Sequence, residues 1–204
     1  MDLSTVSLAR RPSARLSQLA VGLVLYGVSM ACLLRANLGL DPWDVLHQGI
    51  SNRTGWSFGL VVGVVGLAVL LAWLPLRQRP GIGTVANVVV ISVAVEGALA
   101  LIPPGATLAA RIALMVGGVL LNGFATACYV GARLGPGPRD GLMTGLHART
   151  GWSVRVVRTG IEVGVLATGW LLGGTVGVGT VLYAVAIGPL AQLFLPFVTY
   201  RERV

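Results

Sequence analysis

The sequence predicts an all-α transmembrane protein with six spanning helices and two short re-entrant or interfacial helices, built as two inverted repeats of three spans each. The first observation is composition: 55% of the 204 residues are hydrophobic and only 11% are charged, with a mean hydropathy of +0.83. A soluble domain has about 25% charged residues, so this chain cannot cover a water-facing surface. The other two observations are a set of apolar segments and an internal repeat.

Six segments are long and apolar enough to cross a bilayer, which takes about 20 residues at a rise of about 1.5 Å each. Arg, Pro and Gly residues separate them, as expected for turns. None shows the strict alternation of apolar and polar residues found in membrane β-strands. The expected spans are residues 15–36, 57–76, 81–102, 111–132, 153–172 and 177–198.

The internal repeat has a period of 96 residues. Residues 14–102 align with 110–198 without a gap and share 30 identities in 89 pairs, where chance in a chain of this composition gives roughly one in ten. Between 38–57 and 134–153, 11 of 20 pairs are identical, including Pro, Asp, Arg, Trp and Gly in and around the turns. General similarity of apolar helices does not explain such matches, so we expect a duplication.

Each repeat holds three spans and one short segment, and the short segment decides the orientation. If it does not cross the membrane, the second repeat is inverted; if it crosses, the repeats are parallel. With the N-terminus inside, inversion places twelve of the fifteen arginines on the cytoplasmic side, and parallel repeats place ten there. Arginine concentrates on the cytoplasmic side, and 13 residues (42–54) reach only about 20 Å. Both observations favour inversion, with both termini in the cytoplasm.

This topology divides the chain into five parts. They are a cytoplasmic N-terminal tail at 1–13, a first membrane repeat at 14–102, an external linker at 103–109, a second membrane repeat at 110–198 and a cytoplasmic tail at 199–204.

Each short segment opens with a helix-start motif. Asp41 can cap, Pro42 suits the first helical position, and Asp44 suits the positive end of the helix dipole. The second repeat keeps the Pro and the Asp in Gly137-Pro138-Arg139-Asp140. Two interpretations stay open. Re-entrant helices would bring their ends to a site near the midplane of the membrane, whereas interfacial helices would use the acids only as caps.

Under the first interpretation, Asp44 and Asp140 are paired acids of a substrate or ion path. Arg53 and Arg149 are candidate partners for them. Asp44 and Arg53 are too far apart in sequence to pair on one helix face, so any pairing requires another element.

Three further polar residues join this predicted path. Glu96 lies within an apolar run, where an ionisable group is costly and usually functional, although a structural hydrogen bond would also explain it. Gln192 is its counterpart in the second repeat. His47, three residues after Asp44, shares its helix face and has an ordinary pKa near neutrality, although a lone His is often incidental. Glu162, one turn after Arg158, is instead expected to form a local ion pair.

A resemblance to a known family rests on specific motifs. The pattern LGLDPWDVLHQGIS…TGWS, followed by GPGPRDGLMTGL and GGTVGVGT…IGP, resembles the bacterial YczE-like membrane proteins of the YczE/YyaS/YitT group. The resemblance runs from about residue 15 to residue 198. It implies an integral protein of the bacterial cytoplasmic (inner) membrane, but no substrate, reaction or catalytic residue.

These features favour a permease-like transporter of a small solute, with a site between the two repeats. The alternative is a non-transporting accessory or regulatory protein that stabilises a membrane protein partner. An enzyme is not expected, because the sequence has neither HExxH nor Gly-x-Ser-x-Gly; no cofactor or metal is expected either. Membrane lipids are the expected surroundings, and self-association is left open. The net charge of +8 is scattered between apolar runs, so no nucleic-acid partner is expected.

Overall fold

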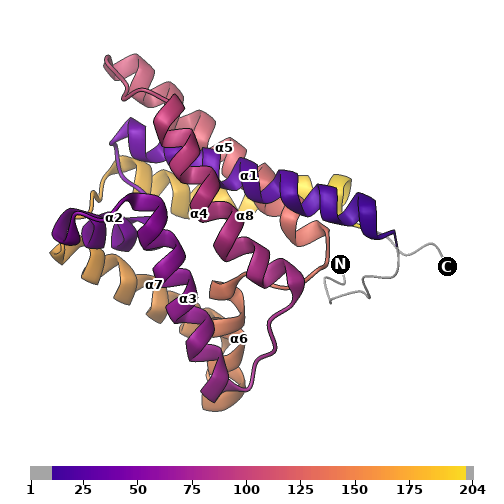
Figure 1. The fold of residues 1–204 in the computed structure, drawn as a ribbon. Coiled ribbons are helices and arrows are strands. Elements are labelled where there is room, and N and C mark those ends of the chain that lie inside the picture. Colours follow the sequence, from indigo (N-terminus) through magenta and orange to yellow (C-terminus); the bar gives the residue numbers. More distant parts are fainter. Residues whose placement is uncertain (1–10, 201–204) are drawn as a thin grey trace.

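A computed structural model describes residues 11–200, and all regular structure in this range is helical (Figure 1). The tails expected at 1–13 and 199–204 lie mostly outside the described residues. The helices are α1 (Pro12–Ala36), α2 (Pro42–Thr54), α3 (Phe58–Leu76), α4 (Ile82–Leu101), α5 (Leu108–Gly131), α6 (Pro138–Thr150), α7 (Val154–Leu171) and α8 (Val178–Val198).

Five of these helices, α1, α3, α4, α5 and α8, are long and apolar enough to cross a membrane. They confirm the prediction of an all-α, multi-pass chain. The sixth expected span, 153–172, forms the 18-residue helix α7, which contains Arg155, Arg158 and Glu162 and is not among the five. The crossing of α7 therefore stays a prediction.

The helices form two groups (Figure 1). In the first group, α1 packs between α4 and α5, and α8 packs on α5. In the second group, α2 and α6 each contact both α3 and α7. The two groups are joined mainly by α3, which packs on α4. The corresponding pair in the second repeat, α7 and α8, makes at most marginal contact.

Glycines on α1 allow its two neighbours to approach closely. A Cβ added at Gly22 would lie 2.8 Å from the backbone nitrogen of Tyr129 on α5, and one at Gly27 would lie 2.8 Å from that of Val95 on α4. Small residues at helix interfaces let backbones approach in this way. The largest buried apolar cluster accordingly forms around α1, where Leu23 is fully buried.

Contacts between the two repeats are reciprocal. Arg15 Nε donates to the carbonyl of Ala132 at 3.0 Å, and Arg111 Nε donates to the carbonyl of Ala36 at 2.7 Å. The two donors are equivalent positions of the 96-residue repeat, and so are the two acceptors, so each repeat donates the same bond to the other. Reciprocal contacts of this kind are typical of a two-fold relation between units.

Each short helix packs on a long helix of the other repeat. Gly141 of α6 lies against the indole of Trp73 on α3, with no room for a Cβ. Gly169 of α7 lies against the backbone of Val45 and Leu46 on α2, also with no room for a Cβ. Residues 45 and 141 are equivalent, as are 73 and 169, so equivalent positions meet in both places, with the glycine on α6 in one and on α7 in the other. This packing holds the N-terminal ends of α2 and α6 near each other.

Candidate functional site

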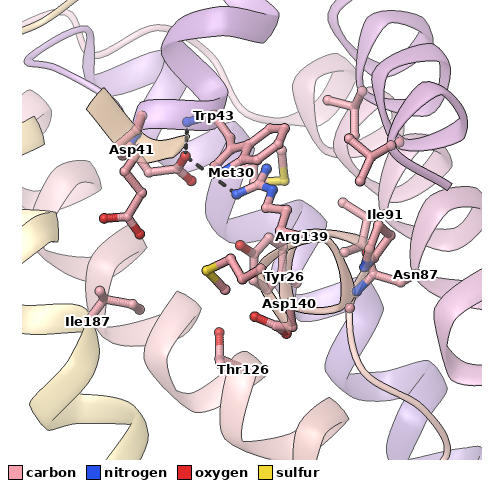
Figure 2. A pocket seen from close by; sticks show the side chains of 18 of the residues that line it. Tyr26, Met30, Asp41, Trp43, Asn87, Ile91, Thr126, Arg139, Asp140 and Ile187 are labelled. Carbon is pink, nitrogen blue, oxygen red and sulfur yellow. Dashed lines mark hydrogen bonds and ion pairs between the residues drawn. The ribbon is translucent and has the colours of Figure 1, made fainter. Parts of the chain in front are cut away.

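A cavity of about 450 Å³ lies between the two helix groups, and all eight helices contribute to its lining. Its walls are largely apolar, with Val and Ile side chains from α3, α4, α7 and α8. Figure 2 shows the side chains around it. The polar and aromatic lining residues are Tyr26, Asp41, Trp43, His47, Asn87, Thr126, Tyr129, Arg139, Asp140, Arg158, Glu162 and Tyr183.

The first turns of both short helices face this cavity. Asp41 caps α2 as predicted, with its Oδ1 accepting from the backbone nitrogens of Trp43 at 2.8 Å and Asp44 at 3.0 Å. Gly137, the equivalent residue in α6, has the same extended backbone but no side-chain cap. Both helices begin at buried or partly buried residues and end at exposed ones, so each points its N-terminus into the protein.

One arginine of the second repeat lies within ion-pair distance of two acids of the first repeat. Arg139 Nη1 lies 3.6 Å from Asp41 Oδ1, and Arg139 Nη2 lies 3.8 Å from Asp44 Oδ1. These distances fit ion pairs but are too long for hydrogen bonds. The guanidinium also stacks over the ring of Trp43, 4.9 Å from its centroid. Asp41 and Asp44 are 1% and 0% exposed, and the Oδ2 atom of each has no hydrogen-bond partner in residues 11–200.

Burial shifts the protonation of this cluster, which lies in α2, outside the five apolar spans. It raises the pKa of Asp41 to about 6, to which the charge of Asp44 adds, and it raises the pKa of Asp44 to about 6 as well. His47 Nδ1 lies 3.0 Å from Asp44 Oδ1, on the shared face that the sequence predicted. Burial, with the charge of Arg139, lowers the pKa of His47 to about 3. The site therefore favours the neutral imidazole, although the ordinary pKa of His lies near neutrality.

A second charged group lies on the α6–α7 side of the cavity. Asp140 lines it, and burial raises the pKa of this carboxyl. Arg158 Nε donates to Glu162 Oε1 at 2.8 Å, which confirms the predicted local pair on α7. Both members of the pair also line the cavity.

A buried chain of hydrogen bonds positions one wall. Tyr183 on α8 donates to Asn122 Oδ1 on α5 at 2.9 Å. Asn122 Nδ2 donates to Ser29 Oγ on α1 at 2.8 Å, and Ser29 donates to the carbonyl of Tyr26 at 2.6 Å. The chain fixes two aromatic lining residues, Tyr26 and Tyr183, relative to each other.

Four residues of the predicted path lie away from the cavity lining. Glu96 is exposed, and its Oε2 accepts from the backbone nitrogen of Gly59 at 2.8 Å, which satisfies the start of α3. Gln192 is exposed on α8. Arg53 and Arg149 are exposed at the C-terminal ends of their helices, and Arg149 donates to the carbonyl of Pro75. The structure pairs neither arginine with Asp44 or Asp140.

Three residues of the predicted path do meet at the site. His47 and Asp140 line the cavity, and Asp44 is linked to the lining residue Arg139. The sequence analysis treated Asp41 only as a helix cap and did not predict its place in the cavity. It also did not predict that Arg139 and the aromatic lining residues belong to the site. A signal for Arg139 existed, since a charged residue there replaces Trp43 of the first repeat.

Comparison with known proteins gives the family. A family model described as a family of unknown function, DUF6198, matches residues 13–196. The chain belongs to this family. The matched range covers all eight helices almost completely and includes every residue that lines the cavity. No solved structure matches the chain.

Relatives of this DUF6198 protein include three bacterial sequences. An uncharacterized protein of Haemophilus influenzae is 41% identical over 180 residues, which cover 88% of this chain and 83% of the relative. The uncharacterized membrane protein YczE of Bacillus subtilis is 36% identical over 84% of this chain and 80% of its own length. YyaS of the same organism is 21% identical over 87% of this chain and 90% of its own length. The resemblance to the YczE-like group is confirmed, and the chain is a multi-pass membrane protein.

Proposed function

We propose that this protein is a permease-like transporter of a small solute, with the cavity between the two helix groups as the solute site. The observation that carries the proposal is the convergence of both short-helix N-termini on a cavity of about 450 Å³. Small-molecule sites have volumes of about 300–1,000 Å³. In transporters built from inverted repeats, broken helices present their ends to a site near the membrane midplane.

An inverted arrangement of the repeats is part of this proposal, and contacts at one end of the molecule support it. Gly105 N–H donates to the carbonyl of Arg35 at 3.2 Å, and Asn52 Nδ2 donates to that of Gly173 at 2.9 Å. The C-terminal ends of α1 and α2 therefore lie with the loops that follow α4 and α7. In this arrangement α2 returns to the side from which it started.

Contacts at the opposite end support the same topology for the second repeat. Tyr200 N–H donates to the carbonyl of Gly131 at 2.9 Å, and Arg149 donates to that of Pro75. The C-terminal ends of α5 and α6 therefore lie with the ends of α8 and α3. Each repeat then crosses three times, with α2 and α6 re-entrant, which favours that interpretation over interfacial helices.

The proposed topology requires α7 to cross the membrane despite its charges. Arg158 and Glu162 neutralise each other and line the cavity. Charged residues in membrane helices usually pair and face a cavity or the bundle interior, so the polarity of α7 agrees with a cavity-lining span. With the arginine distribution of the sequence, this topology places both termini in the cytoplasm of a bacterial inner-membrane protein.

Alternating access to the cavity tests transport without knowledge of the solute. In a variant with Cys32→Ala and Cys128→Ala, a single cysteine at Met143, a lining residue of α6, is treated with a membrane-impermeant methanethiosulfonate in oriented vesicles. A transporter should expose this thiol to reagent from each side in turn. Val64→Cys, on an exposed apolar face of α3, is the control and should react from neither side.

Reaction of the Met143 cysteine from one side only, or from neither, would contradict transport. That result would leave the accessory function as the better account. Covalent capture of a membrane protein partner in cells would then be the next measurement.

A further inference from the structure

A carboxylate that borders the cavity has one oxygen without a hydrogen-bond partner. Asp41 is 1% exposed and lines the cavity. Its Oδ1 caps α2 and faces Arg139, but its Oδ2 accepts no hydrogen bond from any described residue. A buried acceptor without a donor costs free energy, and such atoms are rare in folded proteins. The geometry therefore provides a place for a donor that the chain does not supply.

The charge around the cavity favours a cation. Four acids and two arginines line it or contact its lining, which gives a net charge of −2 with all carboxyls ionised, and His47 adds none. The low dielectric of such a site strengthens this preference. The charged groups are Asp41, Asp44, Asp140, Glu162, Arg139 and Arg158.

The same charges disfavour an anion. A helix N-terminus can bind anions, but the free backbone donors at the start of α2 are taken by Asp41. At the start of α6, Asp140 occupies the third helical position and already places a carboxylate there. A multi-ligand metal site is disfavoured too, since residues 11–200 hold no group of three His, Cys, Asp or Glu side chains placed to bind a metal.

Aromatic rings and apolar walls define the rest of the ligand. Trp43, Tyr26, Tyr129 and Tyr183 line the cavity, and aromatic faces attract cations. Arg139 already uses the face of Trp43 in this way, and Figure 2 shows these two side chains beside Asp41, with Asp140 and Thr126 farther along the cavity. Most of the remaining lining residues are aliphatic. A ligand that satisfies both parts has a cationic head and an apolar body.

We propose that the cavity binds the protonated amine of a small, largely apolar molecule, with Asp41 Oδ2 as the acceptor for the ammonium group. Arg139 holds the other carboxylate oxygen of Asp41 and stays in place. This inference names the substrate class of the proposed transport site, and so it rests on the proposed function. Binding can nevertheless be measured without transport.

The test measures binding to the purified full-length protein in detergent by titration calorimetry at pH 7.5. The probes are 2-phenylethylamine, the neutral 2-phenylethanol and the anion phenylacetate, which share an aromatic body. We expect the amine to bind at least about tenfold more tightly than the alcohol, since a charge-assisted hydrogen bond is involved, and the anion not to bind. Equal affinity for amine and alcohol would overturn the proposal.

A matched pair of variants locates the head group. Asp41→Asn removes the charge but keeps a side-chain oxygen that can cap α2, because Asn is as good a cap as Asp. The thermal unfolding midpoint of this variant shows whether it is folded. Amine affinity should fall at least about tenfold. Glu96→Gln, an acid that caps α3 away from the cavity, should bind as the unaltered protein does. Unchanged amine binding in a folded Asp41→Asn variant would exclude Asp41 as the acceptor.

Inorganic cations are the competing occupant. The titration is repeated in sodium chloride and in choline chloride of equal ionic strength. Sodium could give a binding heat that the Asp41→Asn change abolishes, while the amine gives none. That result would overturn the amine proposal in favour of an ion site. Two-sided labelling of the Met143 cysteine without amine binding would contradict this inference alone. Amine binding with one-sided labelling would contradict the transport function alone.

Discussion

The guanidinium carbon of Arg139 lies 4.9 Å from the centroid of the Trp43 ring, and the two residues are equivalent positions of the two repeats. Equivalent positions of the two repeats therefore contact each other directly. The site is therefore built where the repeats meet, and it is chemically uneven. One repeat supplies Asp41 and Trp43, and the other supplies Gly137 and Arg139 at the same positions.

Removing the arginine should destabilise the protein in a pH-dependent way. Arg139→Gln leaves Asp41 and Asp44 buried together without a counter-charge, which should cost roughly 1–3 kcal/mol at neutral pH. Burial raises the pKa of both carboxyls to about 6, so much of the loss should disappear at pH 5. Thermal unfolding midpoints in detergent at pH 7.5 and pH 5.0 measure the difference. Arg139→Lys, which keeps the charge, is the control, and an equal loss at both pH values would contradict the ion-pair account.

The unaltered protein should become less stable as the pH rises from about 4 to about 6. The folded state holds protons on Asp41 and Asp44 up to a pKa of about 6, whereas unfolded carboxyls release them near pH 3.9. Since the folded state binds more protons in this window, the free energy of unfolding falls with rising pH and levels off above it. Denaturant midpoints from pH 4 to pH 8 test this slope. In an Asp41→Asn, Asp44→Asn double variant the slope from this pair should vanish, and its persistence would assign it to other groups.

Local features of the site were predictable from the sequence. Asp41 and Pro42 define the start of α2 through capping and backbone preference, and the helix observed at Pro42–Thr54 has the predicted bounds. His47 was correctly placed on the same face as Asp44, because helical spacing alone decides that. Its pKa was not predictable, since the shift arises from burial and from Arg139, 92 residues away in sequence.

Features that depend on contacts between elements far apart in the sequence were beyond prediction. Glu96 was assigned to the path because it is an acid in an apolar run, but the donor that satisfies it is the Gly59 backbone at the start of α3. The pairing of Arg139 with Asp41 requires both short helices to point inward at one place. A repeat of 96 residues shows that two units exist, but it does not show which surfaces they share.

The contact between α6 and α3 should tolerate no side chain at Gly141. A Cβ there would overlap the indole of Trp73, whose Nε1 donates to the carbonyl of Pro138 at 2.9 Å. Gly141→Ala should cost roughly 1–3 kcal/mol, because the tightly packed helices must separate. Thermal unfolding in detergent measures the loss. Gly164→Ala on α7, where a Cβ would meet nothing within 4 Å, is the control and should be neutral or slightly stabilising.

A smaller ring at position 73 should restore part of that loss. Trp73→Phe combined with Gly141→Ala relieves the overlap, so the double variant should be more stable than the sum of the single changes. Strict additivity would show that the glycine is required for another reason.

The exposed ends of the two short helices should lie on opposite sides of the membrane. Arg53 and Arg149 are equivalent residues, both exposed at the C-terminal ends of α2 and α6. In the cysteine-free background, Arg53→Cys should react with an impermeant maleimide from the external side only, and Arg149→Cys from the cytoplasmic side only. Thr107→Cys, at the start of α5, marks the external side by the proposed topology. Labelling of both positions from the same side would mean that the short helices cross the membrane and that the repeats are parallel, and it would remove the re-entrant geometry from which the solute site is argued.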